Sequence, residues 1–185
     1  PNPKTSGGAR WNYLAAWAFG MKKMNNDEKQ IQEFVRKIYK NVEVLDTGAR
    51  GSTTTFVERG IGDVLLSWEN EAFLADQEVG KGKIEIVIPS ISVLAEPPVT
   101  VVDQVAKKHG NEKVAAAYLE YLYTEEGQDL IAKNFYRPHS AAATHNYQHQ
   151  FAELELVAID SFGGWDAVQE KHFSDGGIFD QIYLN

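Results

Sequence analysis

Lys4-Thr5-Ser6-Gly7-Gly8-Ala9-Arg10, near the start of the chain, combines a helix start with a candidate ligand site. Ser6 is a favourable helix N-cap, and the two glycines after it allow a ligand to approach the backbone closely. Behind them, apolar residues recur at i, i+3, i+4 and i+7, the spacing of one helix face: Trp11, Leu14, Ala15 and Ala18. The stretch therefore predicts a helix that begins directly after Ser6.

The start of this helix is a candidate anion-binding site. The first-turn N–H groups of a helix have no intrahelical acceptor, and the helix dipole favours negative charge at that end. The Ser6 hydroxyl and the N–H groups of Gly7 and Gly8 would add up to three donors there. An ordinary loop-to-helix cap is the alternative, and this stretch taken alone favours that alternative.

Up to about residue 97 the chain alternates between strand-like and helix-like segments, which favours an α/β fold class. The expected helices are 31–40, 52–59 and 69–74, and the expected strands are 42–45, 63–68, 84–89 and 97–102. The later part is helix-rich, with expected helices at 114–123 and 124–134 and a short strand at 157–159. We therefore predict an α/β anion-binding lobe over residues 1–97 and a helix-rich C-terminal segment over residues 98–185.

Two further groups of donors are predicted to lie near the first. The turn Gly48-Ala49-Arg50 follows one expected strand, and Trp68 ends another. Ligands of open α/β sheets bind beyond the carboxyl ends of the strands. Backbone and indole N–H groups only donate hydrogen bonds, so this site favours a fully ionised anion. A proton on the anion would face donors, at a cost of about 1–3 kcal/mol.

Several long segments carry a resemblance to a known family: KTSGGARWNYL (4–14), DTGARGSTTTF (46–56), GDVLLSWENE (62–71), AEPP (95–98), FGGW (162–165) and DGGIFDQ (175–181). Over its whole length the chain resembles the periplasmic sulfate-binding proteins of ABC importers, the sulfate/thiosulfate group. The resemblance implies the type II periplasmic-binding-protein fold. This chain would supply one lobe of a two-lobed receptor, plus C-terminal segments that normally pack back toward the other lobe.

The resemblance implies binding of sulfate or thiosulfate through hydrogen bonds, with no cationic side chain paired directly to the dianion. The ligand contacts that it implies are the Ser6 hydroxyl, the N–H groups of Gly7, Gly8 and Ala49, and the indole N–H of Trp68. Arg10 and Arg50 are expected to make ion pairs behind the site or at the surface, because Arg is mostly exposed or paired. The implied partners are the missing N-terminal lobe and the membrane subunits of an ABC permease, in the periplasm.

Composition argues against several other classes of partner. The net charge is −8, from 18 basic and 26 acidic residues, with no lysine-rich run, so neither nucleic acid nor an anionic membrane surface is expected. The absence of cysteine removes disulfides and thiolate metal sites. No apolar run has the length of a membrane helix, and no signal peptide is seen. The opening Pro1-Asn2-Pro3, without an initiator Met, suggests a processed chain or a piece of a longer one.

Metal sites and catalytic motifs have little support in the sequence. A zinc site would need the H-E-x-x-H pattern, which is missing, and acidic residues are common in the first turns of helices. The sequence also lacks the P-loop and nucleophile-elbow motifs. We therefore expect no metal and no cofactor. The residues weighed as metal ligands or paired acids are His139, His145, His149, Asp63, Glu69 and Glu71.

We expect a binding protein, not an enzyme, and two alternatives remain open. A ligand-sensing domain of a sulfur-responsive regulator could share this fold, but it would need a helix-turn-helix segment, which this chain lacks. An enzyme acting on a sulfated or phosphorylated substrate would need a base or a nucleophile beside the donors.

Overall fold

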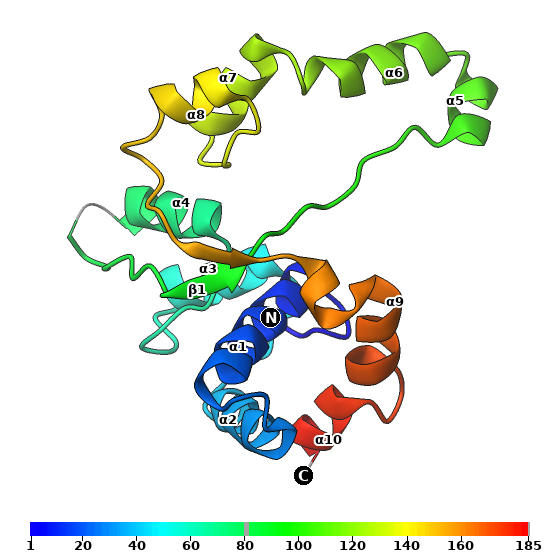
Figure 1. Ribbon diagram of the computed structural model, residues 1–185. Helices are drawn as coiled ribbons and strands as arrows, with labels where there is room; N and C mark the ends of the chain where they lie inside the picture. Colours follow the sequence, from blue (N-terminus) through cyan, green and yellow to red (C-terminus); the bar gives the residue numbers. More distant parts are fainter. Residues whose placement is uncertain (80–81, 185) are drawn as a thin grey trace. The chain divides into compact units, whose positions relative to one another are not determined.

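The computed structural model describes residues 1–79 and 82–184. The chain divides into unit 1, which comprises Pro1–Ala95 and Leu154–Asn185, and unit 2, Glu96–Glu153. The chain thus enters unit 2 after Ala95 and returns to unit 1 at Leu154 (Figure 1). The division differs from the predicted split at residue 97, because residues 154–185 pack with residues 1–95. The assignment of these parts to the lobes of a larger receptor stays a prediction.

Helix α1 (Gly7–Lys23) forms the centre of unit 1 and begins where the sequence predicts. Ser6 is its N-cap, and its side chain accepts a hydrogen bond from the N–H of Ala9. Lys22 and Lys23 lie in the last turn, where the helix dipole favours positive charge. The apolar face of α1 is buried and supplies much of the core, including Trp11, Tyr13, Leu14 and Trp17.

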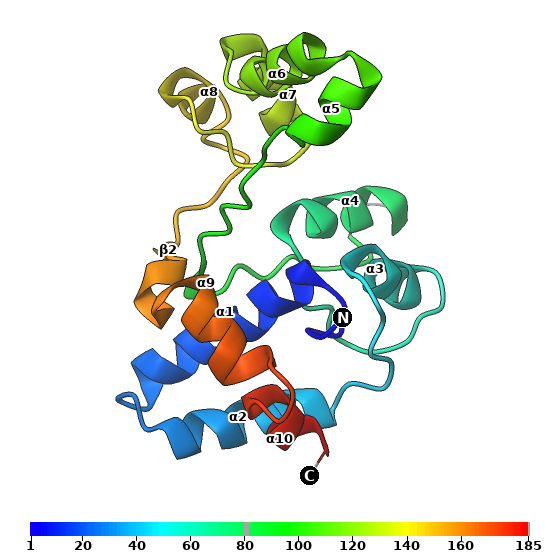
Figure 2. The same cartoon turned by 90° about the vertical axis from the view of Figure 1, so that its right-hand side faces the viewer.

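The other helices of unit 1 pack around α1 (Figure 2). Helix α2 (Glu28–Lys40) is capped by Asp27, and it contacts both α1 and α10 (Ile178–Leu184). The core lies at this junction and contains Ile31, Val35, Phe179 and Ile182. The 3₁₀ helix η1 (Ile159–Phe162), α9 (Gly164–Val168) and the π-helical turn η2 (Gln169–Phe173) connect β2 to α10.

Two short parallel strands form the sheet of unit 1. Strand β1 (Ile91–Val93) pairs with β2 (Glu155–Val157), with Ile91 opposite Glu155 and Val93 opposite Val157. Helix α1 packs against β1, so the sheet and the helical core form one hydrophobic cluster. The strand expected at 157–159 therefore forms two residues earlier, at 155–157.

Four expected strands, 42–45, 63–68, 84–89 and 97–102, are irregular segments in the structure. A strand requires a neighbour that accepts and donates its main-chain hydrogen bonds. No other segment of the described residues takes that position beside these four. Many of their apolar side chains are consequently exposed: Val42, Val44, Val64, Leu66, Val87, Ile88, Val99 and Val102.

Two helices complete unit 1. Helix α3 (Ala49–Val57) begins three residues before the expected position, because Gly48, in an extended conformation, is its N-cap. Helix α4 (Glu69–Val79) starts at the expected residue, directly after Trp68. These two helices contact each other, and Figure 2 shows them side by side next to the start of α1.

Unit 2 is helical. Its helices are α5 (Asp103–His109), α6 (Glu112–Tyr121), α7 (Glu125–Lys133) and α8 (Ala141–Asn146). The predicted cap of α7 is confirmed, since Thr124 accepts a hydrogen bond from the N–H of Gly127. The buried Gln128 side chain joins three segments: it donates to Leu122 O and accepts from the N–H groups of His139 and Ser140. The stability of unit 2 therefore depends on side-chain hydrogen bonds as well as on buried alanines.

Replacing Gly127 by alanine tests this dependence. A Cβ at residue 127 would overlap the carbonyl oxygen of Tyr121 and lie 3.2 Å from Leu122 Cα, both backbone atoms. We expect Gly127→Ala to destabilise unit 2 by about 1–3 kcal/mol, the usual cost of overpacking. Amide hydrogen exchange of α6 and α7 measures the loss. All four tryptophans lie in unit 1, so tryptophan-monitored unfolding should not change; an equal loss in both units would contradict the prediction.

Candidate anion-binding site

The start of α1 carries two candidate donors, the N–H groups of Gly7 and Gly8. The N–H of Ser6 donates to Asn2 O at 3.0 Å, and that of Ala9 donates to Ser6 Oγ at 3.3 Å. Within the described residues no acceptor is found for the N–H groups of Gly7 and Gly8, the first two residues of the helix. The cap uses Ser6 Oγ as an acceptor, so the hydroxyl proton is still available for donation.

Trp68 lies against this helix start. A Cβ on Gly8 would overlap the indole Nε1 of Trp68 and approach its Cε2 to 3.1 Å, so the ring can sit there only because residue 8 is glycine. Asn12 holds the preceding segment in place, since its Nδ2 donates to Leu66 O at 3.1 Å. The indole Nε1 of Trp68 therefore lies against Gly8, although 60 positions separate the two residues along the chain.

The start of α3 is tied to the start of α1 by two hydrogen bonds. Thr5 Oγ1 donates to Thr47 O at 3.0 Å, and the N–H of Asn2 donates to Asp46 O at 2.8 Å. The N-cap Gly48 has no side chain to accept from the first turn, which begins with Ala49. The N–H of Ala49 is thus a donor on the helix neighbouring Ser6, Gly7 and Gly8.

Arg10 and Arg50 interact with protein groups. The Arg50 guanidinium pairs with Glu71 at 3.1 Å and with Glu78 at 2.6 Å, which links α3 to α4 and raises the pKa of Arg50. Glu71 also accepts from Thr53 Oγ1 at 2.8 Å. Arg10 Nε donates to Pro3 O at 3.0 Å, and its guanidinium lies 5.2 Å from the Phe173 ring centroid.

The arrangement can hold an anion by hydrogen bonds alone. Its groups are main-chain N–H, one hydroxyl and one indole, and none of them is an acid, a base in the usual pH range or a metal ligand. Over residues 1–79 and 82–184, no group of three or more His, Asp or Glu side chains is placed to hold a metal ion. None of the helices in the same ranges has the length and apolarity needed to cross a bilayer.

The sequence indicated the donors but missed the residues that hold them together. Asn2 and Thr5 join the starts of α1 and α3, and Lys4 makes contacts with the far end of the chain. The available signal was the short polar side chains around Pro3, which are typical of turns that bond to the neighbouring backbone.

Comparison with known proteins gives consistent matches. The family model described as bacterial extracellular solute-binding protein matches residues 1–137. The sulfate-binding protein of Escherichia coli (strain K12) is 62% identical over 98% of this chain and 56% of its own length. The thiosulfate-binding protein of Pseudomonas aeruginosa PAO1 is 48% identical over 99% of this chain and 55% of its own length.

A solved structure gives the same result. The sulfate-binding protein SubI from Mycobacterium tuberculosis H37Rv aligns with a TM-score of 0.71 and 30% identity, over 92% of this chain and 57% of that chain. This chain therefore spans about half the length of the relatives that it matches.

The fold is that of the periplasmic solute-binding proteins, in a helix-rich α/β form, as the sequence predicted. The chain belongs to the family of bacterial extracellular solute-binding proteins. The assignment of Ser6, Gly7, Gly8, Ala49 and Trp68 as ligand contacts stays a prediction.

Proposed function

We propose that this chain binds sulfate or thiosulfate as part of the periplasmic solute-binding component of an ABC importer. The observation that carries the proposal is the position of the Trp68 indole against Gly8, at the start of a helix whose first N–H groups have no intrahelical acceptor. The names of the similar proteins, sulfate-binding and thiosulfate-binding, support the choice of anion.

The proposed mechanism is capture of a fully ionised tetrahedral anion by donors that are already in place. The N–H groups of Gly7, Gly8 and Ala49, the Ser6 hydroxyl and the Trp68 indole would surround one side of the ion. Two helix dipoles would add to the attraction. Hydrogen phosphate carries a proton at neutral pH, and that O–H would face donors, so phosphate should bind more weakly. This is binding, not catalysis.

We also propose that the complete site needs a second lobe. The relatives are nearly twice as long as this chain, and the exposed apolar residues of segments 42–45 and 63–68 are suited to strands that pair with further polypeptide. Closure of two lobes would exclude water from the anion. Alone, this chain should bind sulfate weakly, and delivery to an ABC permease would require the two-lobed receptor.

Calorimetric titration with sulfate, with phosphate as the control anion, tests the proposal. We expect Trp68→Phe and Ser6→Ala each to weaken sulfate binding by roughly tenfold to a hundredfold, because each removes one hydrogen bond to a charged group. The titration should be made on this chain and on a longer protein that contains it, has both lobes and is as long as the relatives.

Two matched variants control for general effects. Trp165→Phe alters a tryptophan that packs edge-on against Trp11, and Ser140→Ala removes the same kind of helix N-cap in unit 2. Both should keep the affinity for sulfate. If Trp68→Phe and Ser6→Ala also keep it in the two-lobed protein, the assigned site is wrong, and if that protein binds no sulfate, the proposed function is wrong.

A further inference from the structure

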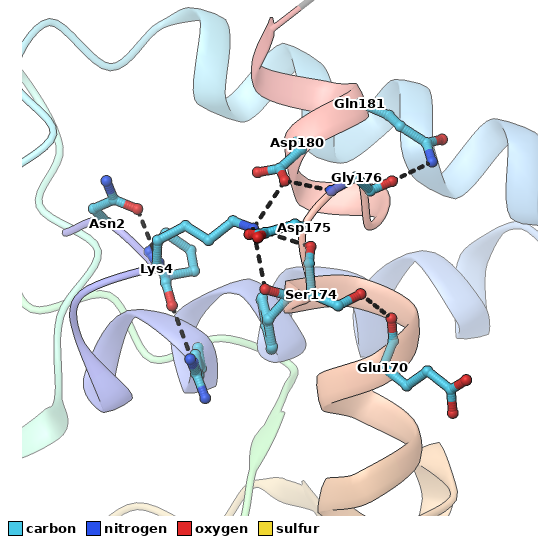
Figure 3. Close-up of polar contacts among 11 residues, drawn as sticks. Asn2, Lys4, Glu170, Ser174, Asp175, Gly176, Asp180 and Gln181 are labelled. Carbon is cyan, nitrogen blue, oxygen red and sulfur yellow. Dashed lines mark hydrogen bonds and ion pairs between the residues drawn. The ribbon is translucent and has the colours of Figure 1, made fainter.

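We propose that Lys4 is a positioning residue of the anion site, which fixes the turn before Ser6 by binding the C-terminal segment of the chain. This inference rests on the proposed function. Lys4 lies two residues before Ser6 and extends toward the turn between η2 and α10 (Figure 3). It would thus connect α10 to the donors of Gly7 and Gly8.

The contacts of the Lys4 ammonium use its full donor capacity. Nζ donates to Phe173 O at 3.0 Å, to Ser174 O at 3.0 Å and to Asp180 Oδ2 at 2.9 Å. An ammonium has three N–H donors and no acceptor, so three acceptors satisfy it completely. We name these four residues the Lys4 cluster. With every proton engaged, Lys4 has no donor left for a bound anion.

The charge of Lys4 is also compensated locally. Asp180 forms the direct ion pair, and Asp175 Oδ1 lies 3.8 Å from Nζ. The side chains of Lys4 and Asp180 are only 25% and 22% exposed, so water screens this pair less than a pair at the open surface. A cation neutralised in this way positions the chain without acting as a counter-ion for the ligand.

The acceptor side of the Lys4 cluster is itself fixed. Asp180 Oδ2 accepts from the N–H of Gly176 at 2.8 Å, and Gln181 Nε2 donates to Gly176 O at 2.9 Å (Figure 3). The hydrogen bond from Lys4 and that from Gly176 keep the pKa of the Asp180 carboxyl below its usual value. Asp180 therefore stays ionised, and its hydrogen bonds hold it in position at the start of α10 as an acceptor for Lys4 Nζ.

The turn that Lys4 holds leads directly into the donors. The N–H of Lys4 donates to Asn2 Oδ1 at 2.9 Å, and the N–H groups of Thr5 and Ser6 donate to Asn2 O at 3.1 and 3.0 Å. On its other side Thr5 is bound to Thr47, at the start of α3. The turn is thus held between α3 and the C-terminal segment. Loss of the Lys4 side removes the support from the C-terminal segment and leaves the turn with its links to α3 and the hydrogen bond from Arg10 Nε to Pro3 O.

The test compares Lys4→Met with Lys22→Met. Both substitutions remove a lysine–carboxylate pair between the α1 region and the C-terminal segment, since Lys22 pairs with Glu155. Only Lys4 lies at the donor end of α1. NMR amide signals of Gly7 and Gly8, their hydrogen exchange, and the indole N–H signal of Trp68 report the geometry without ligand, and sulfate titration reports affinity.

We expect Lys4→Met to shift the three NMR signals, to speed exchange of both glycine amides at least severalfold and to lower sulfate affinity roughly tenfold. Lys22→Met should change none of these. Lys4→Arg should recover part of the effect: it keeps the pair with Asp180, but a planar guanidinium cannot aim three N–H groups from one nitrogen.

Unchanged glycine and indole signals in Lys4→Met would overturn the inference, even if unfolding showed a loss of stability. Equal effects of Lys4→Met and Lys22→Met would overturn it as well. If the unsubstituted chain binds no sulfate in either its short or its two-lobed form, the proposed function fails, and the NMR comparison still decides whether Lys4 positions the turn.

Discussion

Substitution of Gly8 by alanine is expected to abolish most sulfate binding while leaving α1 intact. The added Cβ would overlap the indole Nε1 of Trp68, so the ring must move away from the helix start. The site would then lose the indole donor, together with the close packing of Trp68 on Gly8. Removing one hydrogen bond to a charged ligand costs about 1.5–3 kcal/mol, so we expect roughly a tenfold to hundredfold weaker sulfate affinity.

Gly7→Ala is the control variant for this prediction, and the two variants are compared by the position of the Trp68 ring. A Cβ at residue 7 has no atom within 4 Å, and alanine favours a helix over glycine by about 0.5–1 kcal/mol. The indole N–H signal of Trp68 should therefore move in Gly8→Ala and stay in place in Gly7→Ala. A Gly8→Ala protein with an unmoved indole signal and full sulfate affinity would contradict the prediction.

Acidification should destabilise unit 1 through His172. This side chain is 3% exposed, its Nδ1 lies 2.9 Å from the Tyr13 hydroxyl, and its ring packs edge-on against Trp17. Burial, and to a smaller extent the charge of Lys171, lower the pKa of His172 to about 4, while Glu28 opposes the shift. Burial also raises the pKa of Tyr13, so the phenol keeps its proton, and its hydroxyl shares a hydrogen bond with Nδ1 of the neutral His172 ring.

The sign of the effect follows from proton uptake. Between the unfolded pKa of about 6.5 and the folded pKa, the unfolded state binds the extra proton, so stability falls as the pH falls. The free energy of unfolding of unit 1 should decrease by about 3 kcal/mol between pH 7 and pH 4 from this group. Urea unfolding followed by tryptophan fluorescence measures unit 1 alone, because unit 2 contains no tryptophan.

Two variants separate His172 from the carboxylates that also titrate at low pH. His172→Asn keeps a polar group near the Tyr13 hydroxyl but cannot take up the proton, so it should flatten the pH dependence between pH 6.5 and pH 4. His145→Asn replaces an exposed histidine of unit 2 and should leave the dependence as it is. An unaltered pH dependence in His172→Asn would show that other groups cause it.

Local signals in the sequence predicted the helices well. Ser6 and Thr124 cap α1 and α7 as expected, because capping depends on side chains within three residues of the helix start. The start of α3 was placed too late, since Ser52 has the better capping side chain but Gly48 has the extended conformation. The prediction of strands at 42–45, 63–68, 84–89 and 97–102 was wrong, because a strand depends on a distant partner that its own residues do not specify.

The same distinction between local and distant signals applies to the candidate site. The free N–H groups of Gly7 and Gly8 follow from the helix start alone. Trp68 was expected near this helix start because it ends an expected strand, and the family resemblance implied the same. Its direct packing against Gly8 follows from no local pattern, because the two residues lie far apart in the sequence. The contact between Lys4 and Asp180 spans 176 positions, and neither residue belongs to a motif that points to the other.

The parallel pairing of β1 with β2 makes unit 2 a removable insert. The chain leaves unit 1 beyond Val93 and re-enters it before Glu155, and these residues lie in adjacent strands, offset by two positions of the ladder. Parallel strands need a crossover connection of about a dozen residues or more. A linker of that length in place of residues 96–153 should therefore leave unit 1 as one continuous chain with its core and its donors.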